Sequence, residues 1–249
     1  MILAKNIKMA ELIHQNYAVL SVLRRFEIEL GFGEKTIEEV CQNHQVNPDF
    51  FIEIVNSFND EDYFSESKLK DHDVEDILSY LKNTHNFYLT KKIPDIENRI
   101  QNLKFSENNL QNKKLLENFF NEYKVEFVNH VLREEDRIYP YITELDQSLK
   151  SCKATASFNE NMKKYSISDY EQEHEDIEEK LFDLKNIIIK YLPTPLNPEV
   201  NNSILVKIFK LESDLNEHSR IEEKVIIPKV LEMEKRYLSA VAANKIEIV

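Results

Sequence analysis

From residue 34 to residue 249 the chain contains no glycine, and its two glycines, Gly31 and Gly33, lie in one short loop, ELGFGEK. Glycine makes up about 7% of an average protein, and the tight turns between strands need it because it adopts positive φ without strain. A chain this poor in glycine is therefore not a typical β-rich fold. Rossmann enzymes, P-loop NTPases and protein kinases are excluded as well, because their phosphate-binding loops are glycine-rich.

Long segments rich in Leu, Glu, Lys and Asn show the periodicity of amphipathic helices. After Asp71 we expect four such helices, at about 73–103, about 109–139, about 160–192 and from about 199 onward. Apolar residues recur in each at alternating steps of three and four, which traces the inward face of an antiparallel bundle. Pro193, Pro195 and Pro198 separate the last two helices, and SCKATASFN separates the middle two. The sequence thus predicts an all-α protein with an antiparallel four-helix bundle at residues 72–245.

Residues 1–65 form the second predicted part, a small helical domain ahead of the bundle. Its helices are expected at about 7–26, about 35–44 and about 48–57. Thr36 followed by Glu39 has the pattern of a capping box, and Pro48 suits the first turn of a helix. Because this domain is too small to bury much core of its own, we expect it to pack on the bundle or on a second copy in a homodimer.

Charge and cysteine content exclude further classes of protein. The chain has 32 Lys+Arg against 45 Asp+Glu, a net charge of −13, and no basic stripe, so no nucleic-acid partner is expected. No apolar run reaches the ~18 residues of a membrane span, and the first residues lack an apolar stretch followed by a cleavage site. Cys41 and Cys152 form neither a disulfide framework nor a CxxC pair. We therefore expect a soluble cytoplasmic protein with reduced thiols and no membrane partner.

Four of the seven histidines recur at intervals of 45, 44 and 44 residues, one in each long helix: His85, His130, His174 and His218. Two of them are followed four positions later by a glutamate, Glu134 and Glu222. Both of these segments continue with a second glutamate, an aliphatic residue and a proline, at the same three spacings. The chain therefore contains a two-fold repeat of about 88 residues, in which each helix pair reads H and then HxxxE.

This spacing brings groups that bind metals onto one face. Residues four apart lie about 5–6 Å from each other on a helix, and the four histidines and both glutamates fall on the apolar inward face. A buried carboxylate left unpaired costs several kcal/mol, so two of them beside four histidines indicate a cation. Imidazole and carboxylate together suit iron, manganese or zinc. Four histidines with two carboxylates match two non-haem irons bridged by glutamate.

Other interpretations of these residues explain less. A single histidine on an apolar face is usually a hydrogen-bonded core residue, but four at equal spacing are not accounted for in that way. A ferritin-like site needs two ExxH pairs, and among the four histidines only His174, with Glu171, has one. A haem bound by two histidines leaves the glutamates without a role, and nothing near them marks the substrate pocket of a two-zinc hydrolase. A metal-free helical interaction protein is a further hypothesis.

The segments HVLREEDRIYP and HSRIEEKVIIP resemble the HxxxE signatures of hemerythrin-like bundles. Oxygen carriers of that type use five histidines and HxxxxD, so the repeated HxxxE is more similar to the repair-of-iron-centres (RIC) di-iron proteins. The resemblance implies a metal site formed by His85, His130, Glu134, His174, His218 and Glu222. It also implies that the cofactor is two non-haem iron ions with an oxo or hydroxo bridge. The implied function is repair of iron–sulfur clusters after nitrosative or oxidative stress, by donation of iron, and not conventional enzyme catalysis.

The resemblance extends to the N-terminal domain. The stretch FEIELGFGEKTIEEVC at residues 26–41 is similar to the family's pattern of a helix, a turn with paired cysteines and TLxEAC. Gly31 and Phe32 stand where the paired cysteines occur in the family, so the role of that pair does not carry over to this chain. Cys41, inside a short helix, is expected to be a small core residue.

The implied partners are damaged iron–sulfur proteins, with nitric oxide, dioxygen or peroxide as small ligands. The alternative function is a hemerythrin-like module that binds or senses oxygen or nitric oxide without repair activity. Glu135 and Glu223, which follow the two expected ligand glutamates, point about a third of a turn further round the helix. We interpret them as solvated or outer groups that are not ligands.

Overall fold

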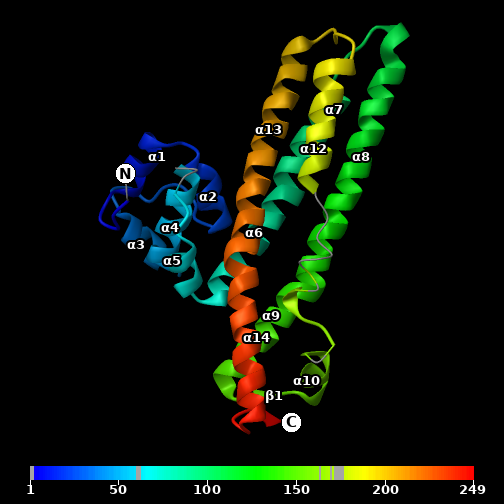
Figure 1. Cartoon of the computed structure of the whole chain (residues 1–249). Coiled ribbons are helices and arrows are strands. Elements are labelled where there is room, and N and C mark those ends of the chain that lie inside the picture. Colours follow the sequence, from blue (N-terminus) through cyan, green and yellow to red (C-terminus); the bar gives the residue numbers. More distant parts are fainter. Residues whose placement is uncertain (1–2, 60–62, 163, 169, 171–176) are drawn as a thin grey trace. The chain divides into compact units, whose positions relative to one another are not determined.

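The computed structural model describes residues 3–59, 63–162, 164–168, 170 and 177–249, and this part of the chain is almost entirely helical (Figure 1). Its named strands are β1 (Lys153–Ala154) and β2 (Glu247–Ile248), which pair in parallel. The all-α helical-bundle class predicted from the sequence is confirmed. Contacts divide the chain into two compact units: unit 1 has residues 1–84, 141–169 and 220–249, and unit 2 has residues 85–140 and 170–219. The predicted domain division at about residue 70 stays a prediction.

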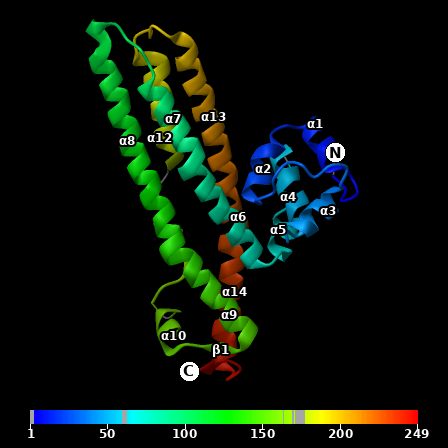
Figure 2. The same ribbon diagram turned by 180° about the vertical axis from the view of Figure 1, so that it is seen from behind.

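Unit 2 consists of helices that lie side by side and alternate in direction along the chain (Figures 1 and 2). Its main helices are α7 (Ile93–Gln101), α8 (Leu110–Arg133), α12 (Ile177–Asn186) and α13 (Pro198–Ile221). A 3-10 turn, Glu107–Asn109, precedes α8. One hydrophobic cluster fills the space between the helices, and Phe120, Leu181 and Ile208 in it are fully buried. The inward face predicted from the apolar spacing is the face that packs here.

Among the described residues, three π-helical segments interrupt long helices, η1 (Tyr88–Lys92), η3 (Glu134–Ile138) and η5 (Glu222–Ile226), and a fourth, η4 (Ile187–Tyr191), ends α12. Each of them is followed by a proline two residues after its end: Pro94, Pro140, Pro193 and Pro228. Proline lacks an N–H and its ring collides with the carbonyl four residues earlier, so it normally breaks a helix. In η1, η3 and η5 the wider π turn accommodates the proline and the helix continues, whereas after η4 the helix ends and Leu192 is extended.

The predicted end of the second long helix at residue 139 is therefore wrong. After η3 the helix continues as α9 (Tyr139–Ser151), and after η5 the last helix continues as α14 (Ile227–Ala242). The first long helix behaves in the same way, because α6 (Val74–Phe87) passes through η1 into α7. Each half of the sequence repeat thus carries a π segment that begins at the glutamate of its HxxxE motif.

The N-terminal part of unit 1 contains five short helices: α1 (Met9–Gln15), α2 (Val19–Arg25), α3 (Ile37–Asn43), α4 (Pro48–Asn59) and α5 (Glu66–Asp71). The single helix expected at about 7–26 is wrong, because Asn16 Oδ1 accepts a hydrogen bond from Ala18 N at 2.9 Å and turns the backbone between α1 and α2. The capping box is confirmed: Thr36 Oγ1 accepts from Glu39 N at 3.2 Å, and the Glu39 carboxylate accepts from Thr36 N at 2.8 Å.

The sequence predicted a third long helix that runs unbroken from about residue 160, and this prediction is wrong. Helix α10 (Ala156–Met162) ends early, and residues 165 and 166 are not helical. The buried Glu234 of α14 accepts hydrogen bonds from Ile167 N at 2.8 Å and from Tyr141 Oη at 2.5 Å. Because this carboxylate accepts the Ile167 N–H, that group makes no hydrogen bond of the kind that would continue a helix from the preceding residues.

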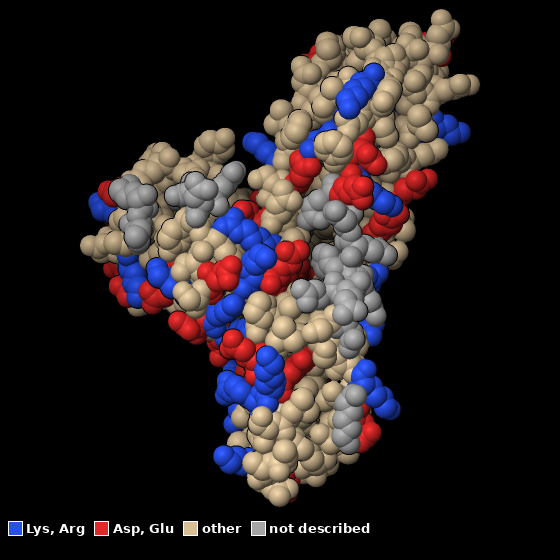
Figure 3. Space-filling view, viewed as in Figure 1, with Lys and Arg blue, Asp and Glu red and all other residues tan. Residues whose placement is uncertain are grey.

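On the face shown in Figure 3, Lys and Arg side chains lie next to Asp and Glu side chains, and several Lys and Arg adjoin one another near the middle of the view. In the part of the chain that the structure describes, no helix is both long enough and apolar enough to span a membrane.

Candidate metal centre

Four of the predicted ligands come together inside unit 2, and they come from four different segments of its helices. His85 is on α6, His130 on α8, Glu134 at the first position of η3 and His218 on α13. None of the four residues is more than 8% exposed, and Glu134 is completely buried. The apolar spacing places these polar side chains in the core because they occupy positions that otherwise carry Leu, Ile or Phe.

The two carboxylate oxygens of Glu134 face different histidines. Oε1 lies 3.0 Å from His130 Nε2, one helical turn earlier, and Oε2 lies 3.1 Å from His85 Nε2. Burial alone would raise the pKa of Glu134, but hydrogen bonds from His130 and His85 outweigh it and hold this pKa well below its usual range. The side chain is therefore an ionised carboxylate in a buried site.

His85 and His218 share one position at the centre, since their Nε2 atoms lie 3.0 Å apart. Glu222 follows His218 by one helical turn, because the chain passes from α13 directly into η5, and its side chain is buried. His85, Glu134, His218 and Glu222 each offer a ligand atom, and these atoms lie within 4.8 Å of one another. Two ring nitrogens and two carboxylate oxygens at this spacing fit a first-row transition metal ion.

His130 lies on the other side of Glu134, at the second carboxylate oxygen. A carboxylate whose oxygens face two separate sets of histidines has the arrangement of a bridging ligand. His174, the remaining predicted ligand, lies outside the described residues. The structure thus brings five of the six predicted residues together, and the complete ligand set stays a prediction.

The sequence model of the hemerythrin family, described as the hemerythrin HHE cation binding domain, matches residues 76–230. This span is more than half of the chain and includes all six predicted ligands. The chain belongs to the hemerythrin HHE cation-binding family. It is accordingly a metal-binding, hemerythrin-like protein. A search of curated proteins found no match to the chain.

Three groups around this hemerythrin-like centre contact its histidines and Glu134. The Tyr170 hydroxyl donates a hydrogen bond to Glu134 Oε1, the Tyr139 ring stacks on His85 at 5.7 Å, and Glu135 Oε1 lies 2.9 Å from His85 Nδ1. Such partners orient metal ligands and tune their basicity. Sequence reasoning missed both tyrosines.

One of these tyrosines left a signal in the sequence and the other did not. Tyr170 lies four residues before His174 on the inward face of the third helix, which placed it near the site. Tyr139 has Ile227 at the corresponding position of the second half, so the repeat did not mark it as a special residue.

A small cavity adjoins the histidines of the centre within unit 2. Its remaining walls are mostly apolar, formed by Tyr88, Phe127, Val131, Ile177, Leu215 and Ser219. The space holds about one group of the size of a water molecule. An apolar recess of this size beside a metal centre suits a small neutral ligand better than an organic substrate.

Proposed function

We propose that this hemerythrin-like protein is a di-iron protein of the RIC type, which repairs iron–sulfur clusters damaged by nitrosative or oxidative stress by donating iron. The observation that carries the proposal is the position of Glu134, whose two oxygens face His85 and His130 separately. The repeat supplies an equivalent carboxylate, Glu222, one turn after His218. Two such carboxylates between two pairs of histidines suit a pair of cations.

Iron is the proposed metal because the donors are imidazole and carboxylate, with no thiolate among the predicted ligands. When bound, two irons would supply the exchangeable metal and the redox chemistry that repair requires. The chain itself would contribute two nitrogens and two carboxylate oxygens to each ion, fewer donors than iron usually takes. Incomplete ligation by the protein favours release of an ion to an acceptor protein.

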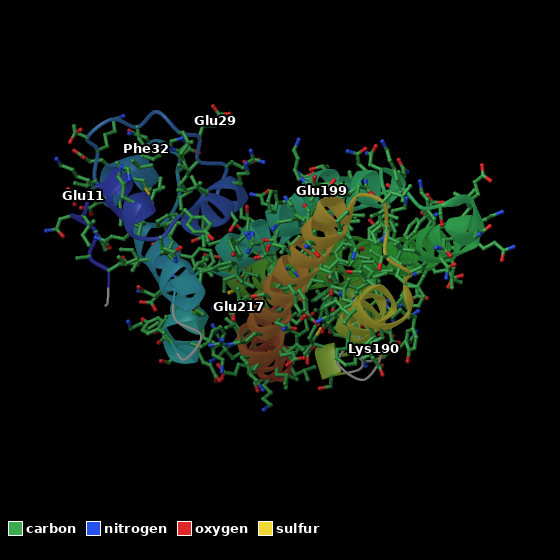
Figure 4. All side chains as sticks on the ribbon, turned by 90° about the horizontal axis from the view of Figure 1, so that it is seen from above. Glu11, Glu29, Phe32, Lys190, Glu199 and Glu217 are labelled. Atoms are coloured by element: carbon green, nitrogen blue, oxygen red, sulfur yellow. The ribbon has the colours of Figure 1, made fainter. Side chains whose placement is uncertain are left out.

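The N-terminal domain offers no paired thiols for this chemistry. Gly31 and Phe32 occupy the loop between α2 and α3 where the family carries its cysteines, and Phe32 is half-buried there (Figure 4). Cys41 is fully buried, and burial raises the pKa of its thiol to about 12. A protonated, inaccessible thiol is inert at neutral pH, so the proposed donation depends on the bundle residues alone.

The test is recovery of a damaged client. The iron-loaded chain is incubated with a nitrosylated or oxidised [4Fe–4S] dehydratase, and the return of dehydratase activity is followed. A His218→Ala variant lacks one ligand, while His44→Ala removes an exposed histidine and serves as the matched control. We expect the native chain and the control to restore activity faster than an equal amount of free ferrous iron. Equal rates for the native chain and free iron contradict the repair function.

The apolar cavity beside the histidines favours a second candidate, binding or sensing of oxygen or nitric oxide without repair. In that case the iron-loaded chain shows a reversible change in its absorption spectrum when the gas is added. The same sample then gives no recovery of the dehydratase. Damaged iron–sulfur proteins are the proposed partners under the first function only.

A further inference from the structure

The imidazole of His85 is held between two consecutive carboxylates of η3. Glu134 Oε2 lies 3.1 Å from its Nε2, and Glu135 Oε1 lies 2.9 Å from its Nδ1. Side chains at neighbouring helix positions normally point about 100° apart. Here they reach the same residue because the ring lies between them and presents one nitrogen to each.

The two nitrogens of His85 have different surroundings. Nε2 is the atom that also faces His218 Nε2 at 3.0 Å, so it points into the metal position. Nδ1 points away from that position toward Glu135, whose side chain is 35% exposed. Glu135 therefore contacts the outer edge of the ligand ring and does not enter the group of atoms that converge on the metal position.

The chemistry of this contact places a hydrogen on Nδ1. An ionised carboxylate can only accept hydrogen bonds, so Nδ1 must be the donor in its bond to Glu135. Without a cation, Nε2 faces the Glu134 carboxylate and carries a hydrogen as well. With a cation in the position shared with Glu134 and His218, Nε2 would give up its hydrogen and direct its lone pair at the ion, while Nδ1 keeps its own, which is the tautomer needed for binding a metal.

The stacked ring of Tyr139 restrains the remaining freedom of His85. The two rings are 5.7 Å apart between centroids and only 5° from parallel. Stacking limits tilt of the imidazole, whereas the bond to Glu135 sets its rotation about the Cβ–Cγ bond. His85 is 1% exposed, so water does not replace Glu135 as a partner without a rearrangement.

We propose that Glu135 is a positioning residue of the metal centre: it holds His85 in the Nδ1–H tautomer with Nε2 directed at the metal position. This inference rests on the proposed metal centre. It assigns the second glutamate of the HxxxEE sequence a role distinct from that of the first. In carboxylate–histidine–metal arrangements generally, loss of such a partner lowers metal affinity by about 10–100-fold.

The experiment measures the affinity of the full chain for Co²⁺, whose visible absorption reports binding, by competition with a chelator. Glu135→Leu removes the acceptor, and Glu135→Gln keeps an acceptor oxygen at nearly the same place. Asp136→Asn is the matched control, because it removes an exposed carboxylate from the next position of η3. Nitrogen NMR of the metal-free proteins reports whether His85 Nδ1 carries a hydrogen, a property that a purely structural role would not change.

We expect Glu135→Leu to bind Co²⁺ about 10–100-fold more weakly, with the same number of ions at saturation, and to lose the hydrogen on His85 Nδ1. Glu135→Gln should recover most of the affinity, and Asp136→Asn should equal the native chain. A native affinity and a native tautomer in Glu135→Leu overturn the inference. Failure of the native chain itself to bind Co²⁺ overturns the metal centre, so the two failures are distinguishable.

Discussion

The Nε2 atoms of His85 and His218 lie 3.0 Å apart, although 133 positions separate the two residues in the chain. His85 belongs to the first half of the sequence repeat and His218 to the second. Among the described residues, each half therefore supplies one imidazole to the metal position between them. This arrangement explains why the repeat must be present twice in one chain.

The first prediction concerns two of the predicted ligands, His130 and Glu134. Replacing His130 and Glu134 together by Ala removes one histidine and the carboxylate between the two positions, so binding of two ions should be abolished. Iron per chain after anaerobic loading and desalting measures this result. Asn129→Ala, an exposed change beside His130, is the control and should retain the native iron content. Two irons in the double variant would show that the ligand assignment is incorrect.

Removal of metal should lower the stability of the chain, because buried ligands that lose their cation must be paired or hydrated in another way. A ligand present at 100 times its dissociation constant adds about 2.7 kcal/mol to the free energy of unfolding. Thermal unfolding followed by circular dichroism, with and without a strong chelator, measures the difference. We expect a Tm lower by several degrees in the chelator. An unchanged Tm contradicts coupling of the metal to folding.

The two cysteines should differ sharply in reactivity. Cys41 is fully buried with a pKa raised by burial to about 12, whereas Cys152 is exposed. In the native chain a thiol reagent should modify Cys152 alone, and Cys41 should react only after unfolding. The reagent is followed by absorbance in the native chain and in Cys152→Ser. Rapid reaction of Cys41 with the reagent in the folded Cys152→Ser variant would contradict this prediction.

Protonation of His72 in mild acid should lower the free energy of unfolding of unit 1. Burial lowers the pKa of this imidazole below its ordinary 6.5, an effect larger than the opposing attraction of Asp49 and Asp76. The unfolded chain then binds more protons than the folded chain, so the contribution of neutral His72 is present above about pH 6.5 and is lost as the pH falls through that value. The ring also packs against Phe50 at 5.2 Å.

Urea unfolding of the native chain and of His72→Gln, each at pH 7 and pH 5, tests this effect. Glutamine does not titrate, so the variant should lose less stability between the two pH values than the native chain does. Equal losses would mean that His72 does not titrate differently in the folded and unfolded states. His14→Gln, at an exposed position, is the control and should behave as the native chain.

Local sequence signals predicted the helical bundle. The apolar period of the helices determines which face is inward, and the same period carries His85, His130, Glu134 and His218 into the core. The capping box at Thr36 could also be predicted from the sequence, because its two hydrogen bonds join residues three apart in the chain.

Features that depend on distant partners were not predictable in this way. The helix passes through Pro140 because a π segment forms before it, although proline is normally a stop signal. The break before Ile167 depends on Glu234, which lies 67 positions away in the sequence. The contact of Glu135 with His85 also joins two helices, so the sequence showed only that Glu135 points away from the ligand face.

The central claim is that six inward side chains on four helices hold two cations. Anomalous diffraction at the iron edge from crystals of the iron-loaded chain tests it most directly. We predict two iron peaks on either side of Glu134, one bonded to His85 and His218 and the other to His130. A single peak, or peaks away from these side chains, would contradict the account.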